Sequence, residues 1–270
     1  MKDLKKIAAQ RRADAVTMIA NAGAGHTGGA MSCLDILTCL YYDVMHIDAN
    51  NPDDPDRDRF VLSKGHCVEG LYAILADLGF IKKEELSTFS KGGTRLIGHP
   101  NNKVEGIEVC SGALGHGLSI GVGMALGAKR THRGYRTYVV MGDGEQAEGS
   151  IYEAAMSAAH YKLDNLYAII DRNGLQISGS TEEVMALDSI KEKWEAFGFD
   201  VVELDGNDMD ALVSYFHSER PAGKPHLLIA KTVKGKGLPF AENRADWHHK
   251  VPTAEQLTLA YEALGVKGAE

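Results

Sequence analysis

Apolar residues recur along the chain at two spacings, and each spacing predicts a different kind of element. Helical spacing opens the sequence and predicts a helix that stops at Gly23-Ala24-Gly25, with one apolar stripe made of Leu4, Ile7, Ala8, Ala15, Met18, Ile19 and Ala22. Short continuous apolar runs lie at 60–62, 137–141, 166–170, 201–204 and 227–230. We interpret the last four of these runs as strands.

Helical patterns separate these apolar runs. They cover about 146–161, 190–197 and 208–218, and a capping box of Thr253 and Gln256 begins a last helix that ends near Gly265. Alternating strands and helices predict an α/β fold with a mainly parallel sheet and helices on both faces. No linker or repeat interrupts the pattern, so we expect one domain over residues 1–270.

Two strand ends carry oxygen ligands. Gly142-Asp143-Gly144-Glu145 follows the run at 137–141, and Asn173 follows the run at 166–170. Glycines let backbone N–H groups approach a diphosphate closely, and Asp143 and Asn173 offer the oxygen ligands that Mg²⁺ prefers. Each motif alone is also typical of a tight turn, but their pairing across a βαβ unit favours a site where a metal ion holds a diphosphate.

Composition narrows the class of protein. The 270 residues carry a net charge of -8 and no Lys/Arg run, which argues against a nucleic-acid partner. No apolar run is long enough to span a membrane, and no signal peptide is visible. The four cysteines form no CxxC pair, so we expect reduced thiols in a cytoplasmic protein rather than a zinc site or disulfides.

Four of the eleven histidines lie in loops marked by glycine, proline or tryptophan: His26, His66, His99 and His248. Loops at the carboxyl ends of parallel strands carry ligand sites, and imidazole is suited to proton transfer near neutral pH. Any one of these histidines alone is more simply a hydrogen-bonded loop residue. Zinc binding by several of them is an alternative, but no HxxH-type spacing supports it.

Taken together, the motifs resemble the N-terminal, cofactor-diphosphate-binding section of transketolase. They occur in the family's order over nearly the whole chain: Gly25-His26-Thr27-Gly28, Arg57-Asp58-Arg59-Phe60, Ser63-Lys64-Gly65-His66, Gly98-His99-Pro100, Gly112-Ala113-Leu114-Gly115, Gly142-Asp143-Gly144-Glu145, Asp171-Arg172-Asn173, and Lys231-Thr232 through Trp247-His248.

The resemblance implies thiamine diphosphate and a divalent metal, Mg²⁺ or else Ca²⁺ or Mn²⁺, as cofactors. Asp143, Asn173 and the backbone carbonyl of Leu175 would hold the metal, and Gly144 would offer its backbone to the diphosphate. The loop from Gly112 to Gly115, with Leu114 in it, would lie against the aminopyrimidine.

The same resemblance implies roles for the four loop histidines. His66 and His248 would lie near the diphosphate and the reacting centre, and His26 and His248 would assist proton transfers and stabilise oxyanions. His99 would bind the terminal hydroxyl of the donor sugar. Glu148 matches an acidic residue that, in the family, lies at the subunit interface and links paired cofactors.

The chain departs from the family in two respects. Full-length members continue with a pyrimidine-binding section, which supplies the glutamate that activates the cofactor, and then a C-terminal domain. Gln is also usual where His116 stands. We therefore expect the N-terminal subunit of a split transketolase, active with a C-terminal-section partner as an α2β2 assembly. It would transfer a two-carbon ketol unit from a ketose, or its phosphate, to an aldose.

Three other classes of protein remain as alternatives. One is another thiamine diphosphate enzyme, such as a 2-oxoacid dehydrogenase α-subunit or a deoxyxylulose-phosphate synthase. A second is a non-catalytic partner that only binds the cofactor, although four loop imidazoles serve no evident purpose there. A third is a nucleotide-binding α/β protein, which would need a phosphate loop of the Walker type that the sequence lacks.

Overall fold

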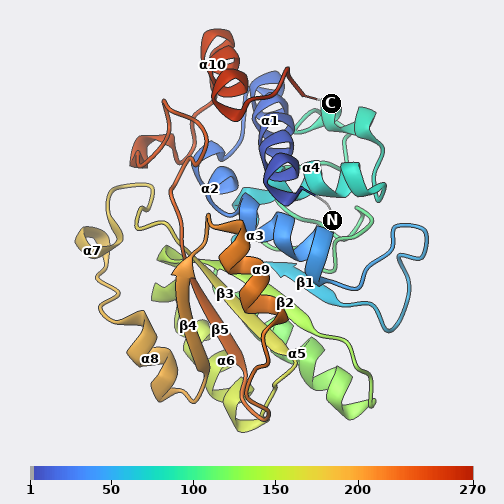
Figure 1. The fold of residues 1–270 in the computed structure, drawn as a ribbon, viewed down its shortest axis with the longest axis vertical. Coiled ribbons are helices and arrows are strands. Elements are labelled where there is room, and N and C mark those ends of the chain that lie inside the picture. Colours follow the sequence, from blue (N-terminus) through green and yellow to red (C-terminus); the bar gives the residue numbers. More distant parts are fainter. Residues whose placement is uncertain (1–2, 270) are drawn as a thin grey trace.

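A five-stranded parallel sheet forms the centre of the molecule (Figure 1). The structure, a computed structural model, describes residues 3–269. The strands are β1 (Arg59–Leu62), β2 (Thr137–Gly142), β3 (Leu166–Arg172), β4 (Asp200–Asp205) and β5 (His226–Lys231). Their order across the sheet is β1-β2-β3-β5-β4, and every neighbouring pair is parallel.

Helices connect the strands and extend beyond one end of the sheet (Figure 1). They are α1 (Leu4–Ala22), α2 (Thr27–Ser32), α3 (Leu34–Cys39), α4 (Val68–Leu78), α5 (His116–Arg130), α6 (Gly149–His160), α7 (Thr181–Val184), α8 (Ile190–Ala196), α9 (Met209–His217) and α10 (Ala254–Leu264). Shorter turns are the π-helical Leu40–Val44 and the 3-10 segments Gly65–Cys67, Lys83–Thr88, Gly144–Ala147 and Ala245–Trp247.

Alternate residues of each strand point into two different cores. In β2, Tyr138 and Val140 pack into a core shared with α1, α3, α4 and α9. Val139 and Met141 pack instead against α5, α6 and α8. Successive side chains of a strand point to opposite faces, so the buried central strands β2, β3 and β5 are apolar on both sides. The predicted α/β fold, with helices on both faces of a parallel sheet, is confirmed.

Helix α5 lies unusually close to the sheet. Gly117 and Gly121 face it, and a Cβ at Gly117 would clash with Ser63 while one at Gly121 would clash with Val139. No side chain of α5 therefore separates the helix from the strands at these two points. Helix α5 begins directly after the loop that ends at Gly115.

Most predicted helix ends match the structure, and one helix begins later than predicted. Helix α1 ends at Gly23 in the left-handed conformation, and α10 has its capping box at Thr253. The helix expected over 146–161 is instead a 3-10 turn followed by α6 from Gly149. The backbone of Glu148 is extended there (ψ 129°), which ends the first turn before α6 begins.

The structure also bears on the cysteines and on membrane-spanning helices. The thiols of Cys33, Cys39, Cys67 and Cys110 are all free, as predicted. Within residues 3–269, no helix has the length and apolar character needed to cross a membrane.

Candidate active site

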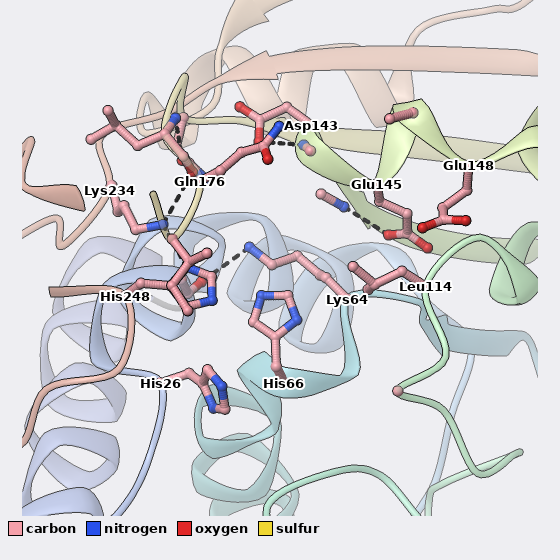
Figure 2. Close-up of a pocket in the computed structure, with 18 of the residues that line it drawn as sticks. His26, Lys64, His66, Leu114, Asp143, Glu145, Glu148, Gln176, Lys234 and His248 are labelled. Carbon is pink, nitrogen blue, oxygen red and sulfur yellow. Dashed lines mark hydrogen bonds between the residues drawn. The ribbon is translucent and has the colours of Figure 1, made fainter. Parts of the chain in front are cut away.

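A cavity of about 490 Å³ opens where the carboxyl ends of β1, β2, β3 and β5 meet. Each strand leads into a polar residue that lines it: Lys64 after β1, Asp143 after β2, Asn173 after β3 and Lys234 after β5. Figure 2 shows His26, with two other histidines, on the side of this cavity opposite Asp143. This edge of a parallel sheet is where the architecture places ligand sites.

Both carboxylate oxygens of Asp143 accept hydrogen bonds from neighbouring groups. One carboxylate oxygen accepts a hydrogen bond from the backbone N–H of Gly144 (2.8 Å). The other accepts from the N–H of Gly174 (2.6 Å) and lies 3.3 Å from the Arg172 guanidinium. Burial raises the pKa of Asp143 and the charge of Asp171 adds to this, while the Gly174 N–H opposes it.

The loop after β3 brings the other two predicted metal ligands into the same cavity. The amide of Asn173 is oriented by two contacts, Nδ2 to Asp171 (3.4 Å) and Oδ1 accepting from the Leu175 N–H (3.1 Å). The carbonyl oxygen of Leu175 accepts a hydrogen bond from Lys234 Nζ (3.1 Å). Asp143, Asn173 and Leu175 thus all line one wall.

This donor set fits a hard divalent cation. A carboxylate, an amide oxygen and a backbone carbonyl are ligands typical of Mg²⁺ or Ca²⁺, and Mg²⁺ usually shares its sphere with phosphate oxygens. Among residues 3–269, no group of three or more His, Cys, Asp or Glu side chains is arranged to hold a metal. The predicted ligand set belongs to a different type because it contains only one carboxylate, that of Asp143.

The neighbouring wall fits an anionic group. Gly144 packs closely against Gln176, since a Cβ there would lie 3.0 Å from the Gln176 side chain and would have to displace it. Gln176 Nε2 is buried and has no hydrogen-bond partner in the structure. A buried donor without an acceptor is costly, and a bound phosphate oxygen would satisfy it. Gln176 is a site residue that the sequence did not identify.

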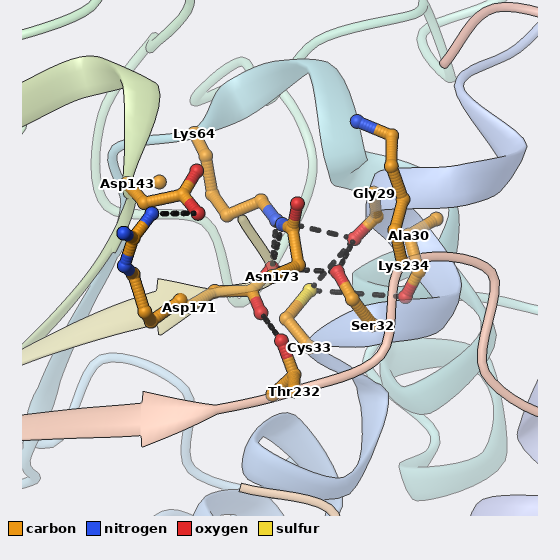
Figure 3. A network of polar contacts seen from close by, with 12 residues as sticks. Gly29, Ala30, Ser32, Cys33, Lys64, Asp143, Asp171, Asn173, Thr232 and Lys234 are labelled. Carbon is orange, nitrogen blue, oxygen red and sulfur yellow. Dashed lines mark hydrogen bonds and ion pairs between the residues drawn. The ribbon is translucent and has the colours of Figure 1, made fainter. Parts of the chain in front are cut away.

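The two lysines of the cavity differ in their partners, and Figure 3 shows those of Lys64. Lys64 forms a buried ion pair with Asp171, whose carboxylate also accepts hydrogen bonds from Ser32 and Thr232. Burial opposes its charge, but Asp171 raises the pKa of Lys64. Lys234 is buried against the Leu175 carbonyl and His248, and burial together with the charge of Lys64 lowers its pKa.

Five histidine rings cluster on the other side of the cavity. The ring of His26 lies 5.2 Å from that of His66, 6.2 Å from His99, 5.5 Å from His248 and 4.5 Å from His249. Burial is the largest cause that lowers the pKa of His26, His66 and His248 to about 3, followed by the neighbouring His66 for His26, by Lys64 for His66 and by Lys234 for His248. These imidazoles are therefore neutral at pH 7, able to donate and to accept a proton.

One ring nitrogen in this cluster has an assigned role. Lys234 Nζ lies 2.9 Å from Nδ1 of His248. Because an ammonium group can only donate, Nδ1 must accept and the ring proton is on Nε2. His249 was not singled out from the sequence, although its ring is the nearest to His26.

The loop expected to contact the aminopyrimidine is fixed by a buried carboxylate. Glu145 accepts hydrogen bonds from the N–H groups of Gly115 (2.8 Å) and Gly142 (3.0 Å), and from the Ser63 hydroxyl. Gly112 lies against His99, where a Cβ would come within 2.7 Å of the imidazole. Close packing thus explains glycine at this position.

The structure brings nearly all the predicted site residues to one cavity. Lining it are His26, His66, His99, Gly112, Leu114, Asp143, Gly144, Glu148, Asn173, Leu175 and His248. Gly115 is buried behind this lining, and His116 is exposed as the first residue of α5. Lys64, Lys234 and Glu145 lay within motifs quoted from the sequence but had received no role.

The family model that describes the thiamine diphosphate-binding domain of transketolase matches residues 4–270. One of the subunits of an apulose-4-phosphate transketolase from Phocaeicola vulgatus is 57% identical over 242 residues, which are 89% of this chain and 86% of that protein. The protein of the same description from Actinobacillus succinogenes is 45% identical over 264 residues, which are 97% of this chain and 96% of that protein.

More distant relatives show the same likeness. A 6-deoxy-6-sulfo-D-fructose transketolase subunit from a Clostridium species is 42% identical, over 93% of this chain and 92% of that protein. The solved transketolase of Campylobacter jejuni superimposes with a TM-score of 0.91 at 32% identity, over 97% of this chain and 43% of that longer chain. The chain therefore belongs to the transketolase family, as the N-terminal, thiamine diphosphate-binding part of a split transketolase.

Proposed function

We propose that this chain and a C-terminal-section partner together transfer a two-carbon ketol unit from a phosphorylated ketose to an aldose, with thiamine diphosphate and Mg²⁺. The observation that carries the proposal is the meeting of two sets of groups in one cavity. Oxygen ligands for a metal-bound diphosphate line one side, and neutral imidazoles line the other. The relatives' descriptions support the reaction type.

Asp143, Asn173 and the Leu175 carbonyl would hold the metal, and the N–H of Gly144 would face the diphosphate. Lys234 and Gln176 add one positive charge and one unpaired donor beside them. Opposite charge and a free N–H both favour a phosphate oxygen in a partly dry cavity. Gly112 and Leu114 would border the ring system of the cofactor.

The histidines would bind the sugar substrate and transfer its protons. When bound, thiamine diphosphate supplies a nucleophilic carbon and an electron sink for breaking a carbon–carbon bond. Neutral His26 and His248 can take protons from sugar hydroxyls and return them, and Nε2–H of His248 can donate to an alkoxide. His66 would border the reacting centre, and His99 would bind the donor's terminal hydroxyl.

The partner would complete each active site. The relatives with 57%, 45% and 42% identity are each described as one subunit of a transketolase, which supports a second chain. Glu148 is exposed at the mouth of the cavity, where it suits a contact with that chain. We propose an α2β2 assembly in the cytoplasm, with the activating glutamate supplied by the partner.

Apulose-4-phosphate is the donor to test first. The two relatives with 57% and 45% identity carry this sugar in their descriptions, whereas the relative described for a sulfonated sugar is 42% identical. Ordinary pentose phosphates are the second choice. The contacts that would distinguish these sugars are expected largely on the partner chain.

The test is ketol transfer by this chain alone and by the reconstituted pair, each with and without thiamine diphosphate and Mg²⁺. Apulose-4-phosphate, a pentose-phosphate ketose and a 2-oxoacid serve as alternative donors. Transfer only from a ketose, only with both chains and both cofactors, is the expected result. Turnover of the 2-oxoacid alone, or activity without the cofactor, would overturn the proposal.

A further inference from the structure

Helix α4 carries a buried carboxylate directly beneath the His26 loop. Glu69 is fully buried in the first turn of this helix. One of its oxygens accepts a hydrogen bond from the backbone N–H of His26 (2.8 Å), and the other has no partner. The preceding Gly25 packs against the first of these oxygens, where a Cβ would lie 2.8 Å away. A fully buried carboxylate is costly, so its place here calls for a reason beyond packing.

One helical turn later, α4 holds a second loop of the cavity. Tyr72 is also fully buried, and its hydroxyl lies 3.2 Å from the carbonyl oxygen of His99 and 3.1 Å from that of Ile97. Residues three apart on a helix share a face, so Glu69 and Tyr72 point in the same direction. Burial raises the pKa of Tyr72, and the nearby charge of Glu69 adds to this.

A third histidine is joined to the same helix through the chain itself. His66 lies in the short 3-10 turn Gly65–Cys67, which runs directly into α4. The backbone segments that carry His26, His66 and His99 are therefore all attached to this one helix. Two are held by side-chain hydrogen bonds to the backbone, and the third is held by direct connection.

We propose that α4 is the positioning helix of the histidine cluster, in which Glu69 sets the place of His26 and Tyr72 sets the place of His99. The proposal rests on the proposed function only in that His26 and His99 handle the sugar. Neither Glu69 nor Tyr72 lines the cavity, so both act through other residues.

The two residues should have different kinetic signatures. A displaced His26 impairs proton transfer, so Glu69→Ala should lower kcat by about 10- to 100-fold, since misplacement by about 1 Å can cost that much. A displaced His99 weakens binding of the donor sugar, so Tyr72→Phe should raise the donor KM by about 10-fold. This is the factor in affinity that one weak hydrogen bond contributes.

The conservative variant Glu69→Gln separates positioning from packing. Its amide oxygen can still accept from the His26 N–H, and its shape is that of the acid, so kcat should return to within about threefold of the parent value. Ile74→Val, which removes one buried methylene from the same helix, is the matched control for lost stability. It should change neither kcat nor KM. All measurements use the reconstituted complex.

A chemical readout tests the geometry without turnover. Diethyl pyrocarbonate modifies neutral imidazoles, and mass spectrometry locates the modified ring. Glu69→Ala should speed modification of His26 and leave His99 unchanged, and Tyr72→Phe should do the reverse. If both rings respond equally in both variants, or as they do in Ile74→Val, the proposal is wrong. Absence of ketol transfer in the parent complex would refute the proposed function instead, with the labelling result still decisive for α4.

Discussion

The amino and carboxyl edges of the sheet carry similar kinds of residue, which serve different purposes at each edge. At the amino edge, a cavity of about 450 Å³ is lined by Arg136, Arg220 and His226, among others. The charges there find partners within the chain: Arg220 pairs with Asp200, and His226 bonds to Asp200 (3.2 Å) and to a backbone carbonyl (3.1 Å). The carboxyl edge instead gathers His26, His66 and His248 around a lysine whose contacts are a carbonyl and an imidazole.

The difference teaches how to distinguish a structural cluster from a site. Where a cation lies against a carboxylate, as Arg220 does against Asp200, its charge is paired within the chain and the pair stabilises the fold. Where imidazoles face Lys234 and its contacts are a carbonyl and a ring nitrogen, an anionic ligand would supply the negative charge that the cluster lacks. Cavity size alone, about 490 Å³ against about 450 Å³, would not separate the two edges.

The largest expected effect is at the carboxyl edge. Asp143→Ala should abolish Mg²⁺-dependent binding of thiamine diphosphate, because the remaining oxygens are uncharged, and ketol transfer should fall to background with the cofactor lost. Titration calorimetry and activity of the reconstituted pair measure this. Asp205→Ala, at the exposed end of the edge strand β4, is the matched control and should bind normally. Normal binding by Asp143→Ala would remove Asp143 from the metal site.

The next effect concerns the imidazoles. Alanine at His26, His99 or His248 should lower kcat/KM by about 10²- to 10⁴-fold, the range for a lost acid–base group, while cofactor binding and folding stay intact. Steady-state kinetics and circular dichroism check both statements. His160→Ala, outside the cavity on α6, serves as the control. Near-normal rates in all three variants would sink the assignment of the histidines.

A smaller effect sharpens the comparison through pH. Burial raises the pKa of Glu69 to about 7, and the His26 N–H opposes this. Since the folded state holds the proton more tightly, the stability contributed by Glu69 is present below pH 4.5 and is lost as pH rises towards 7. Glu69→Gln cannot ionise, so it should gain about 3 kcal/mol over the parent between about pH 4.5 and 8.

Urea unfolding of the chain across this pH range measures the gain. The exposed Glu262→Gln is the control, and it should follow the parent at every pH. A difference in unfolding free energy between Glu69→Gln and the parent that stays constant with pH would contradict this. It would mean that Glu69 is ionised at every pH tested and binds no proton on folding.

The smallest effect is at the amino edge, and it should appear only in stability. Arg220→Met leaves Asp200 with His226 alone and should lower the free energy of unfolding by about 1 to 3 kcal/mol, the value of a lost charged hydrogen bond. The kcat and KM of the reconstituted pair should not change. A fall in kcat without loss of stability would mean that the amino edge is also a functional site.

The sequence predicts the fold and much of the site because both rest on local patterns. Apolar runs specify the strands, and the residues just after them must meet at one edge, which is why Asp143 and Asn173 were found together. The helix expected over about 146–161 begins only at Gly149 because its start depends on the extended backbone of one residue, Glu148. No apolar period encodes such a change.

What the sequence does not reveal is which residues meet across long separations. His249 and Gln176 stand in loops without a motif, and only the folded chain brings them to the cavity or the cluster. Glu69 lies within an apolar helix, where a charged residue would ordinarily be placed on the solvent face. Its burial follows from the packing of α4 under the His26 loop, 43 residues away in sequence.

The close contact between α5 and the sheet, made through glycines without side chains, has a mechanical consequence. With glycine at 117 and 121, no flexible side chain lies between helix and strand to absorb a displacement. A single methyl group added at Gly121 should therefore tilt α5 as a rigid body. The first residues of α5, and Leu114 just before them, would then move out of the cavity wall. The helix loses about 1 kcal/mol of propensity at each of these glycines. In return, the loop that borders the cavity is held against the central sheet.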